Sequence, residues 1–288
     1  GYDVVVSSSH AVGKGVIPPS TAIHICYCHT PMRYAWEMEQ DYLEDFGVPK
    51  FLRPKAKRML KKIRRWDLTT AKRVDHFIAN SKTTQERIKR YYGRESVVLH
   101  PPVDDRFFQL PESNAAKREF FLTVGRLVPY KRIDLLIETA NRERFPLKIA
   151  GTGPEEAKLK RLAGPTVEFL GYIEDIKLPL LYASARAFLF PVHEDAGIVP
   201  LEAQACGTPV IAFGKGGALD TVVEGETGIF FTKQTIDHVA EAIRRFESME
   251  FDSEKIRAHA KKFSGERFRE KLQEIVEDAM VVPGFRVG

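Results

Sequence analysis

Residues 187–210 hold the feature that most constrains the fold of this chain, a buried strand that leads through a short loop into a helix. The apolar run 187–191 is typical of a strand that is buried on both faces. Residues 198–205 have the spacing of a short helix, which Gly207 and then Pro209 would end. The segment therefore predicts a strand-loop-helix corner.

The loop of this corner is suited to an anion that is flanked by sugars. A helix that begins near Gly197 directs its first free N–H groups, those around Ile198 and Val199, toward a diphosphate. Glu194 precedes the helix, and Glu202 lies about one turn inside it. Carboxylates repel phosphate, so we expect both to accept hydrogen bonds from sugar hydroxyls. A sugar, a diphosphate and a ribose together describe a nucleotide-sugar.

The stretch EDAGIVPLEAQACGTPVIA separates Glu194 from Glu202 by seven residues. Two acids at this spacing are common, but with the following LEAQACGTPV they resemble the E-x7-E motif of retaining GT-B glycosyltransferases of family 4, which includes many bacterial and archaeal mannosyltransferases. The resemblance implies that Glu194 contacts the donor sugar and Glu202 the ribose hydroxyls. The family usually has a bulky residue where this chain has Ala196, which bears on the shape of the sugar pocket. The alternative is two solvated acids on a surface loop.

The composition of the chain suits an ordinary protein of about two domains, with 288 residues of which 43% are apolar and 29% charged. No apolar run approaches the ~20 residues that span a bilayer, and no signal peptide opens the chain, so a cytoplasmic location is expected. Three cysteines are an odd number and predict reduced thiols. No metal site is predicted at Cys26-Tyr27-Cys28-His29, because no second ligand pair at zinc-like spacing follows.

Apolar runs alternate with helical patterns in two halves of the chain. The alternation predicts an α/β fold with two Rossmann-like domains whose parallel sheets face each other across a cleft. Prolines at 101–102 predict a linker, which divides the chain into an N-terminal domain (1–102) and a nucleotide-sugar-binding domain (103–262). The resemblance implies that the helix of 263–288 returns toward the first domain. It also implies that the first, acceptor-side domain is partial, since the chain begins in its later part.

Two cations follow the predicted strand 120–124. Arg126 offers a bidentate fork and Lys131 a mobile point charge, and both lie where cations converge on a diphosphate. In the family, the G-R-x4-K pattern that starts here at Gly125 binds the donor diphosphate. The two cations would stabilise the charge on the leaving group in place of a metal, in keeping with the absence of a D-x-D motif. The alternative is a solvated basic loop.

Other strand ends carry further candidates for substrate binding. Gly153 belongs to a G-x-G turn after an apolar strand, which is a weak signal by itself. Gly171 and Tyr172 end another strand, whose following loop borders the nucleotide base in the resemblance. His29 opens the segment HTPMRYAW at a strand's carboxyl end, where α/β sheets bind ligands. The resemblance implies that His29 lies near the donor sugar or phosphate, although a structural histidine is the alternative.

Residues 50–65 contain nine basic and no acidic residues, in a chain whose net charge is +5. Apolar residues recur among them at helical spacing, which predicts a basic amphipathic helix: Leu52, Ala56, Met59, Leu60, Ile63 and Trp66. One interpretation is a helix that packs on the core and has a solvated charged face. The other is a surface that meets anionic lipid or a phosphate-bearing acceptor at the inner face of the membrane. Nucleic acid is disfavoured, because no aromatic-rich binding motif accompanies the charge.

The motifs together predict a retaining glycosyltransferase that moves a hexose to a glycan or lipid-linked acceptor. Mannose from GDP-mannose is favoured, because HTPMRYAW looks most like the mannosyltransferases of surface polysaccharide synthesis. No cofactor is expected beyond the nucleotide-sugar substrate. A nucleotide-sugar epimerase of the same fold would instead convert its donor without an acceptor, and a binding module would hold the donor without turnover.

Overall fold

The computed structural model describes residues 1–37, 49–109 and 118–281. They belong to two compact units, one made of Gly1–His100 with Arg269–Gly288 and the other of Pro101–Phe268. Parts of all three predicted segments, including the end of 263–288, lie outside the described residues. The domain boundaries after 102 and 262 stay a prediction.

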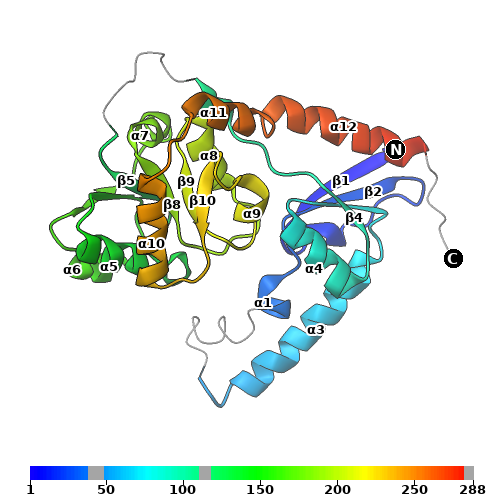
Figure 1. Cartoon of the computed structure of the whole chain (residues 1–288). Helices are drawn as coiled ribbons and strands as arrows, with labels where there is room; N and C mark the ends of the chain where they lie inside the picture. Colours follow the sequence, from blue (N-terminus) through cyan, green and yellow to red (C-terminus); the bar gives the residue numbers. More distant parts are fainter. Residues whose placement is uncertain (38–48, 110–117, 282–288) are drawn as a thin grey trace. The chain divides into compact units, whose positions relative to one another are not determined.

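The first unit is built on a parallel sheet with the strand order β1-β2-β3-β4 (Figure 1). Ser9 at the end of β1 pairs with Cys28 at the end of β2, so the loops that follow these two strands begin at the same edge of the sheet. The elements are β1 (Val4–Ser9), η1 (Gly13–Gly15), β2 (Ile23–Cys28), α1 (Arg33–Trp36), α3 (Arg53–Ala71), β3 (His76–Ala79), α4 (Lys82–Tyr92) and β4 (Ser96–Val98).

The core of this sheet follows the two-residue period of its strands. Cys26 and Cys28 lie on the same face of β2 and pack with Phe77 and Ala79 of β3. Both cysteines are buried and free. The predicted cap of α4 is present, since the Ser81 hydroxyl accepts a hydrogen bond from the Thr84 N–H at 3.1 Å.

Helix α3 covers residues 53–65 of the predicted basic segment 50–65, but its buried face is not the one that the apolar spacing suggested. Leu52, Met59 and Trp66 are 42%, 57% and 41% exposed, whereas the fully buried residues are Asp67, Thr70 and Ala71. The helix contacts η1, α1 and α4, and this packing buries its carboxyl-terminal end. The interpretation that all the apolar residues of 50–66 pack on a core is therefore wrong for these three.

The second unit holds a six-stranded parallel sheet with the order β10-β9-β8-β5-β6-β7. From β5 the chain adds β6 and β7 on one side, then crosses back and adds β8, β9 and β10 on the other. The elements are η2 (Asp105–Phe108), β5 (Phe121–Val124), η3 (Pro129–Lys131), α5 (Ile133–Glu143), β6 (Leu147–Ala150), α6 (Glu156–Leu162), β7 (Val167–Gly171), α7 (Leu178–Ser184), β8 (Ala187–Phe190), α8 (Ile198–Ala205), β9 (Val210–Phe213), α9 (Ala218–Thr221), β10 (Gly228–Phe231), α10 (Ile236–Glu247) and α11 (Ser253–Lys261), followed by α12 (Gly265–Val281).

This strand order creates a topological switch point between β5 and β8, where connections leave in opposite directions. Open α/β sheets bind ligands outside the carboxyl ends of the strands at such a point. The loop with Arg126 follows β5, and the loop with Glu194 follows β8. The fold therefore places both predicted donor-binding loops at the switch point.

Both faces of the second sheet are buried. Phe121 faces one core cluster with helices α5 and α10, and its neighbour Leu122 faces the other, to which α7, α8 and α11 contribute. Full burial of an apolar side chain of this size contributes about 1.5–3 kcal/mol. Two apolar faces hold the strands firmly, so the loops at their ends are the positions free to vary for binding. Among the described residues, no helix has both the length and the apolar character that a membrane crossing needs.

Candidate functional site

A cavity of about 510 Å³ opens at the carboxyl ends of β5, β6 and β7. Four residues singled out from the sequence line it, namely Gly125, Arg126, Gly153 and Tyr172. The remaining lining residues are Val124, Ala150, Gly151, Thr152, Pro154, Ile173, Asp175 and Leu178. The cavity is large enough for a nucleotide-sized ligand.

Glycine is required at the floor of this cavity because the backbones approach too closely for a side chain. A Cβ on Gly153 would lie 2.3 Å from the carbonyl oxygen of Leu127, and a Cβ on Gly151 would lie 1.9 Å from that of Gly125. The weak G-x-G signal of the sequence thus marks a tight contact between the loops after β5 and β6. Gly171 lies just beyond, and its carbonyl accepts a hydrogen bond from the Gly151 N–H at 2.7 Å.

The two predicted cations differ in their surroundings. Arg126 is exposed, and its side chain has no hydrogen-bond or ion-pair partner among residues 1–37, 49–109 and 118–281. Lys131 is 13% exposed, forms an ion pair with Glu194, and lies 3.9 Å from where a Cβ of Gly125 would be. The pair joins the loop after β5 to the loop after β8 across the switch point. A ligand anion would meet one cation that is free and one that is held by a carboxylate.

Gly197 begins helix α8 in the left-handed conformation, with φ of 64°. A Cβ there would lie 2.8 Å from the carbonyl oxygen of Gly217, so both the backbone angle and the close packing favour glycine. Gly217 in turn donates its N–H to the carbonyl of Glu194 at 2.8 Å. Ile198 and Val199 form the first turn of the helix. The corner predicted from the sequence is thus held together by backbone contacts around the start of α8.

Glu202 lies inside α8 and accepts a hydrogen bond from the Tyr182 hydroxyl of α7 at 3.1 Å. Burial raises the pKa of Glu202 to about 7, although the Tyr182 hydrogen bond and the charge of Arg106 act in the opposite direction. Arg106 pairs with Asp175 at 3.1 Å, and Asp175 lines the cavity. A largely buried carboxylate of this kind is suited to accept hydrogen bonds from a ligand's hydroxyls, since the Tyr182 hydroxyl is its one hydrogen-bond donor among the described residues.

His29 belongs to the first unit, at the carboxyl end of β2. Its Nε2 lies 2.8 Å from the Ser8 hydroxyl, and its backbone carbonyl accepts a hydrogen bond from the Thr84 hydroxyl at 3.0 Å. Burial, and secondarily the nearby His10, lower the pKa of His29 below its usual value. At neutral pH the ring is therefore uncharged and acts through hydrogen bonds.

Sequence reasoning missed Asp175, Tyr182 and Arg106. Asp175 follows β7 by four residues, and its position after a strand was the only available signal. Tyr182 and Arg106 approach Glu202 from helices that are distant in the sequence, and no local pattern marks them. The predicted residues of the second unit, by contrast, all lie at the end of β7, on the loops after β5, β6, β7 and β8 or on α8.

Two family models match the chain. The model described as glycosyl transferases group 1 matches residues 104–263, and the model described as glycosyltransferase family 4 matches residues 1–107. Together they cover the loops and the helix described above.

Two curated relatives illustrate the similarity. A GDP-mannose-dependent alpha-(1-6)-phosphatidylinositol monomannoside mannosyltransferase of Mycolicibacterium smegmatis is 34% identical over 192 residues, which are 57% of this chain and 50% of that protein. A D-inositol 3-phosphate glycosyltransferase of Geodermatophilus obscurus is 32% identical over 231 residues, or 69% and 51%. The chain thus spans about half the length of these relatives.

Solved structures show the same fold. Sucrose-phosphate synthase from Thermosynechococcus elongatus is 20% identical, with a TM-score of 0.71 over 97% of this chain and 74% of that one. Anabaena HepE in complex with UDP is 19% identical, with a TM-score of 0.68 over 89% and 72%. The predicted GT-B fold of two Rossmann-like units is confirmed.

Proposed function

Because the chain belongs to the glycosyl transferases group 1, as its motifs predicted, we propose that it is a retaining glycosyltransferase that moves mannose from GDP-mannose to a glycan or lipid-linked acceptor. The observation that carries the proposal is the cavity at the carboxyl ends of β5, β6 and β7, which Gly125 and Arg126 line, together with the Lys131–Glu194 pair between the loops after β5 and β8. Of the predicted donor-binding groups, Arg126 lines the cavity, whereas Lys131, Glu194, the start of α8 and Glu202 belong to the neighbouring loop after β5, the loop after β8 and α8. Cations, a helix start and carboxylates match a diphosphate that is flanked by two sugars.

Donor binding would rearrange the Lys131–Glu194 ion pair. A diphosphate between Arg126 and Lys131 competes with the Glu194 carboxylate for the lysine, because it brings more negative charge to the same place. Glu194 would then be free to accept hydrogen bonds from the donor sugar. As the glycosidic bond to the phosphate breaks, the two cations stabilise the charge that develops on the leaving diphosphate. The retention of configuration rests on the family resemblance.

The carboxylate of Asp175 is an argument that the base bound in the cavity is guanine. Guanine presents two neighbouring N–H donors on one edge, and a carboxylate can accept both. Uracil presents a single N–H between two carbonyl oxygens, which a carboxylate would repel. Asp175 lines the cavity and forms an ion pair with Arg106. The relative from Mycolicibacterium smegmatis is named for its dependence on GDP-mannose, in agreement with this choice of donor.

A lipid-linked acceptor is supported by the surface of α3. Three exposed apolar residues seven positions apart form an apolar stripe, namely Leu52, Met59 and Trp66. Helical spacing places a basic stripe directly beside it, formed by Lys55, Arg58, Lys62 and Arg65, all exposed. A helix that has apolar residues beside cations can lie in the interface of an anionic bilayer, with the apolar residues buried and the cations near the lipid headgroups. Two of the relatives named above act on inositol-containing acceptors by their names.

The test of the donor is a thermal-shift panel of GDP, UDP and ADP sugars, followed by a transfer assay with radiolabelled GDP-mannose and a membrane lipid extract. A ligand that binds only the native state raises the melting temperature. Stabilisation by GDP-mannose with transfer to lipid is expected. Stabilisation without transfer would indicate a binding module, and conversion of the sugar without an acceptor would indicate an epimerase.

The base is tested with Asp175→Asn, which should weaken GDP binding about tenfold or more and affect UDP much less, since a charged acceptor is worth about 1.5–3 kcal/mol. The matched control is Glu174→Gln. Glu174 is the adjacent exposed acid, it pairs with Lys177, and it is not among the residues that line the cavity. If the two substitutions change the affinity for GDP equally, Asp175 does not contact the base.

A further inference from the structure

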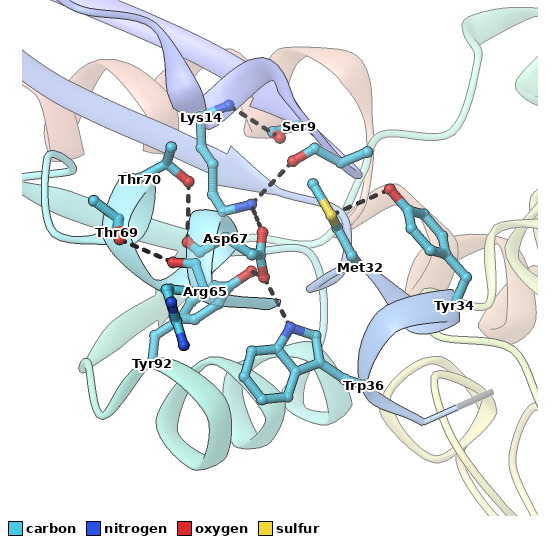
Figure 2. A network of polar contacts seen from close by, with 11 residues as sticks. Ser9, Lys14, Met32, Tyr34, Trp36, Arg65, Asp67, Thr69, Thr70 and Tyr92 are labelled. Atoms are coloured by element: carbon cyan, nitrogen blue, oxygen red, sulfur yellow. Dashed lines mark hydrogen bonds and ion pairs between the residues drawn. The ribbon is translucent and has the colours of Figure 1, made fainter. Parts of the chain in front are cut away.

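The first unit contains a buried ion pair that the proposed reaction does not use. Asp67 of α3 is 0% exposed and Lys14 of η1 is 2% exposed, and their side chains form an ion pair. The Asp67 carboxylate also accepts hydrogen bonds from the Trp36 indole and the Tyr92 hydroxyl, each at 2.8 Å (Figure 2). One carboxylate thus joins residues from four elements: η1, α1, α3 and α4.

The first connection of Asp67 leads to the loop before η1. The Lys14 ammonium also donates to the Ala11 carbonyl at 2.9 Å, and the Lys14 N–H donates to the Ser9 hydroxyl at 3.1 Å. Ser9 in turn accepts, through its backbone carbonyl, the N–H of His29 at 2.8 Å. Its neighbour Ser8 holds the His29 ring. Lys14 therefore fixes the segment that contacts both the backbone and the ring of His29.

The second connection leads to the segment after His29. Trp36 ends α1, which starts four residues after His29, and its ring also stacks on Tyr91 with centroids 4.7 Å apart. Asp67 therefore holds chain segments on both sides of His29, one through Lys14 and the other through Trp36. No other buried carboxylate does so among the residues that the structure describes.

A buried ion pair is a poor way to gain stability, because removing two charges from water costs about as much as their attraction returns. Replacing such a pair with uncharged side chains is often neutral or stabilising. Here the carboxylate has three donors around it, so its geometry is strongly determined. A network of this kind serves to specify one arrangement of the loops that it joins.

We propose that Asp67, through Lys14 and Trp36, is a positioning residue that sets the orientation of the His29 ring for sugar transfer. The inference rests on the proposed function and on the family resemblance, which implies that His29 lies near the donor sugar or phosphate. Asp67 itself touches no substrate. A displacement of a reacting group by about 1 Å can reduce turnover by about 10²-fold, so loosening either connection is expected to lower kcat.

Two variants loosen the two connections separately. Lys14→Met with Asp67→Asn removes both charges and leaves an oxygen that accepts from Trp36 and Tyr92. Trp36→Phe removes the indole donor and keeps an aromatic ring against Tyr91. Each should lower kcat about 10- to 100-fold, with the donor KM changed less than twofold, because the donor cavity lies in the other unit. The control, Asp75→Ala, removes the acceptor of the His24 N–H at the far end of β2 and should leave kcat unchanged.

A second readout is independent of turnover. The ring resonances of His29 in ¹⁵N-labelled protein, assigned by their loss in His29→Gln, should move in both test variants and not in the Asp75→Ala control. If the intact chain transfers no sugar, the proposed function fails, and these resonances still decide whether Asp67 orients the ring. Unmoved His29 resonances would overturn the inference. A normal kcat in both variants would also overturn it. So would a loss of kcat that is seen only near each variant's melting temperature and is absent well below it, because such a loss reports unfolding.

Discussion

Replacing Glu202 with glutamine is expected to stabilise the second unit at neutral and higher pH while it weakens donor binding. The Glu202 carboxylate is largely buried in α8, and burial raises its pKa from 4.5 to about 7. The folded protein therefore disfavours the ionised form. Glutamine keeps an oxygen that accepts the hydrogen bond of the Tyr182 hydroxyl, and it carries no charge. The substitution therefore removes the free-energy cost of burying that charge.

The size of the effect follows from the pKa shift. An acid whose pKa is higher in the folded state contributes stability below its unfolded pKa of 4.5 and loses it as the pH rises through about 7. A shift of about 2.5 pKa units at 1.36 kcal/mol per unit corresponds to at most about 3 kcal/mol. The free energy of unfolding of the wild type should therefore fall between pH 5 and 8, and that of Glu202→Gln should stay flatter.

The assay is calorimetric unfolding of both proteins from pH 5 to 8. Trp36 and Trp66 are the only tryptophans of the chain and both belong to the first unit, so tryptophan fluorescence reports that unit alone. The fluorescence transition is the internal control and should be the same in both proteins. Donor affinity, measured by titration calorimetry, should fall about 10- to 100-fold, because the ribose hydroxyls lose a charged acceptor worth about 1.5–3 kcal/mol.

Two results would refute the reasoning. If Glu202→Gln is less stable than the wild type at pH 8, burial of the ionised Glu202 carboxylate does not destabilise the folded protein. If affinity for GDP and UDP is unchanged, Glu202 does not contact the ribose. A gain of stability together with a loss of binding is the pattern expected of a residue that is retained for function.

Three further predictions concern the rest of the site and the surface of α3. Removing Arg126 or Lys131 should lower kcat about 10²- to 10³-fold, with activity that survives EDTA; a chelator-sensitive reaction restored by Mg²⁺ would contradict their role as leaving-group stabilisers. Glu194→Ala should weaken binding of the sugar-bearing donor and leave the bare nucleotide nearly unaffected, and equal losses for both ligands in calorimetry would place Glu194 elsewhere. Neutralising Lys62 and Arg65 of the basic stripe of α3 should reduce sedimentation with anionic vesicles steeply, at about 1 kcal/mol per charge, whereas neutralising Lys57 and Lys61 on the other side of the helix should reduce it less; equal losses would point to net charge alone.

The sequence by itself determined the local structure around the site. Strands were predicted because runs such as 120–124 and 187–191 are short and apolar, and α8 because its spacing and Gly207 mark a helix and its end. Those signals depend on the few residues around each position, so they can be read along the chain. The motifs around Glu194 and Arg126 also pointed to the family.

The tertiary structure decided which of these segments meet. Lys131 and Glu194 are 63 positions apart, and their pairing follows from β5 and β8 being neighbours in the sheet. The pKa of Glu202 follows from the packing of α7 on α8, and no property of α8 alone indicates it. No sequence pattern marks Asp67, because its environment comes from η1, α1 and α4, which are distant from it in the chain. Sequence patterns specify which face or end of an element a residue occupies, while burial, ion pairing and pKa depend on neighbours that are distant in the chain.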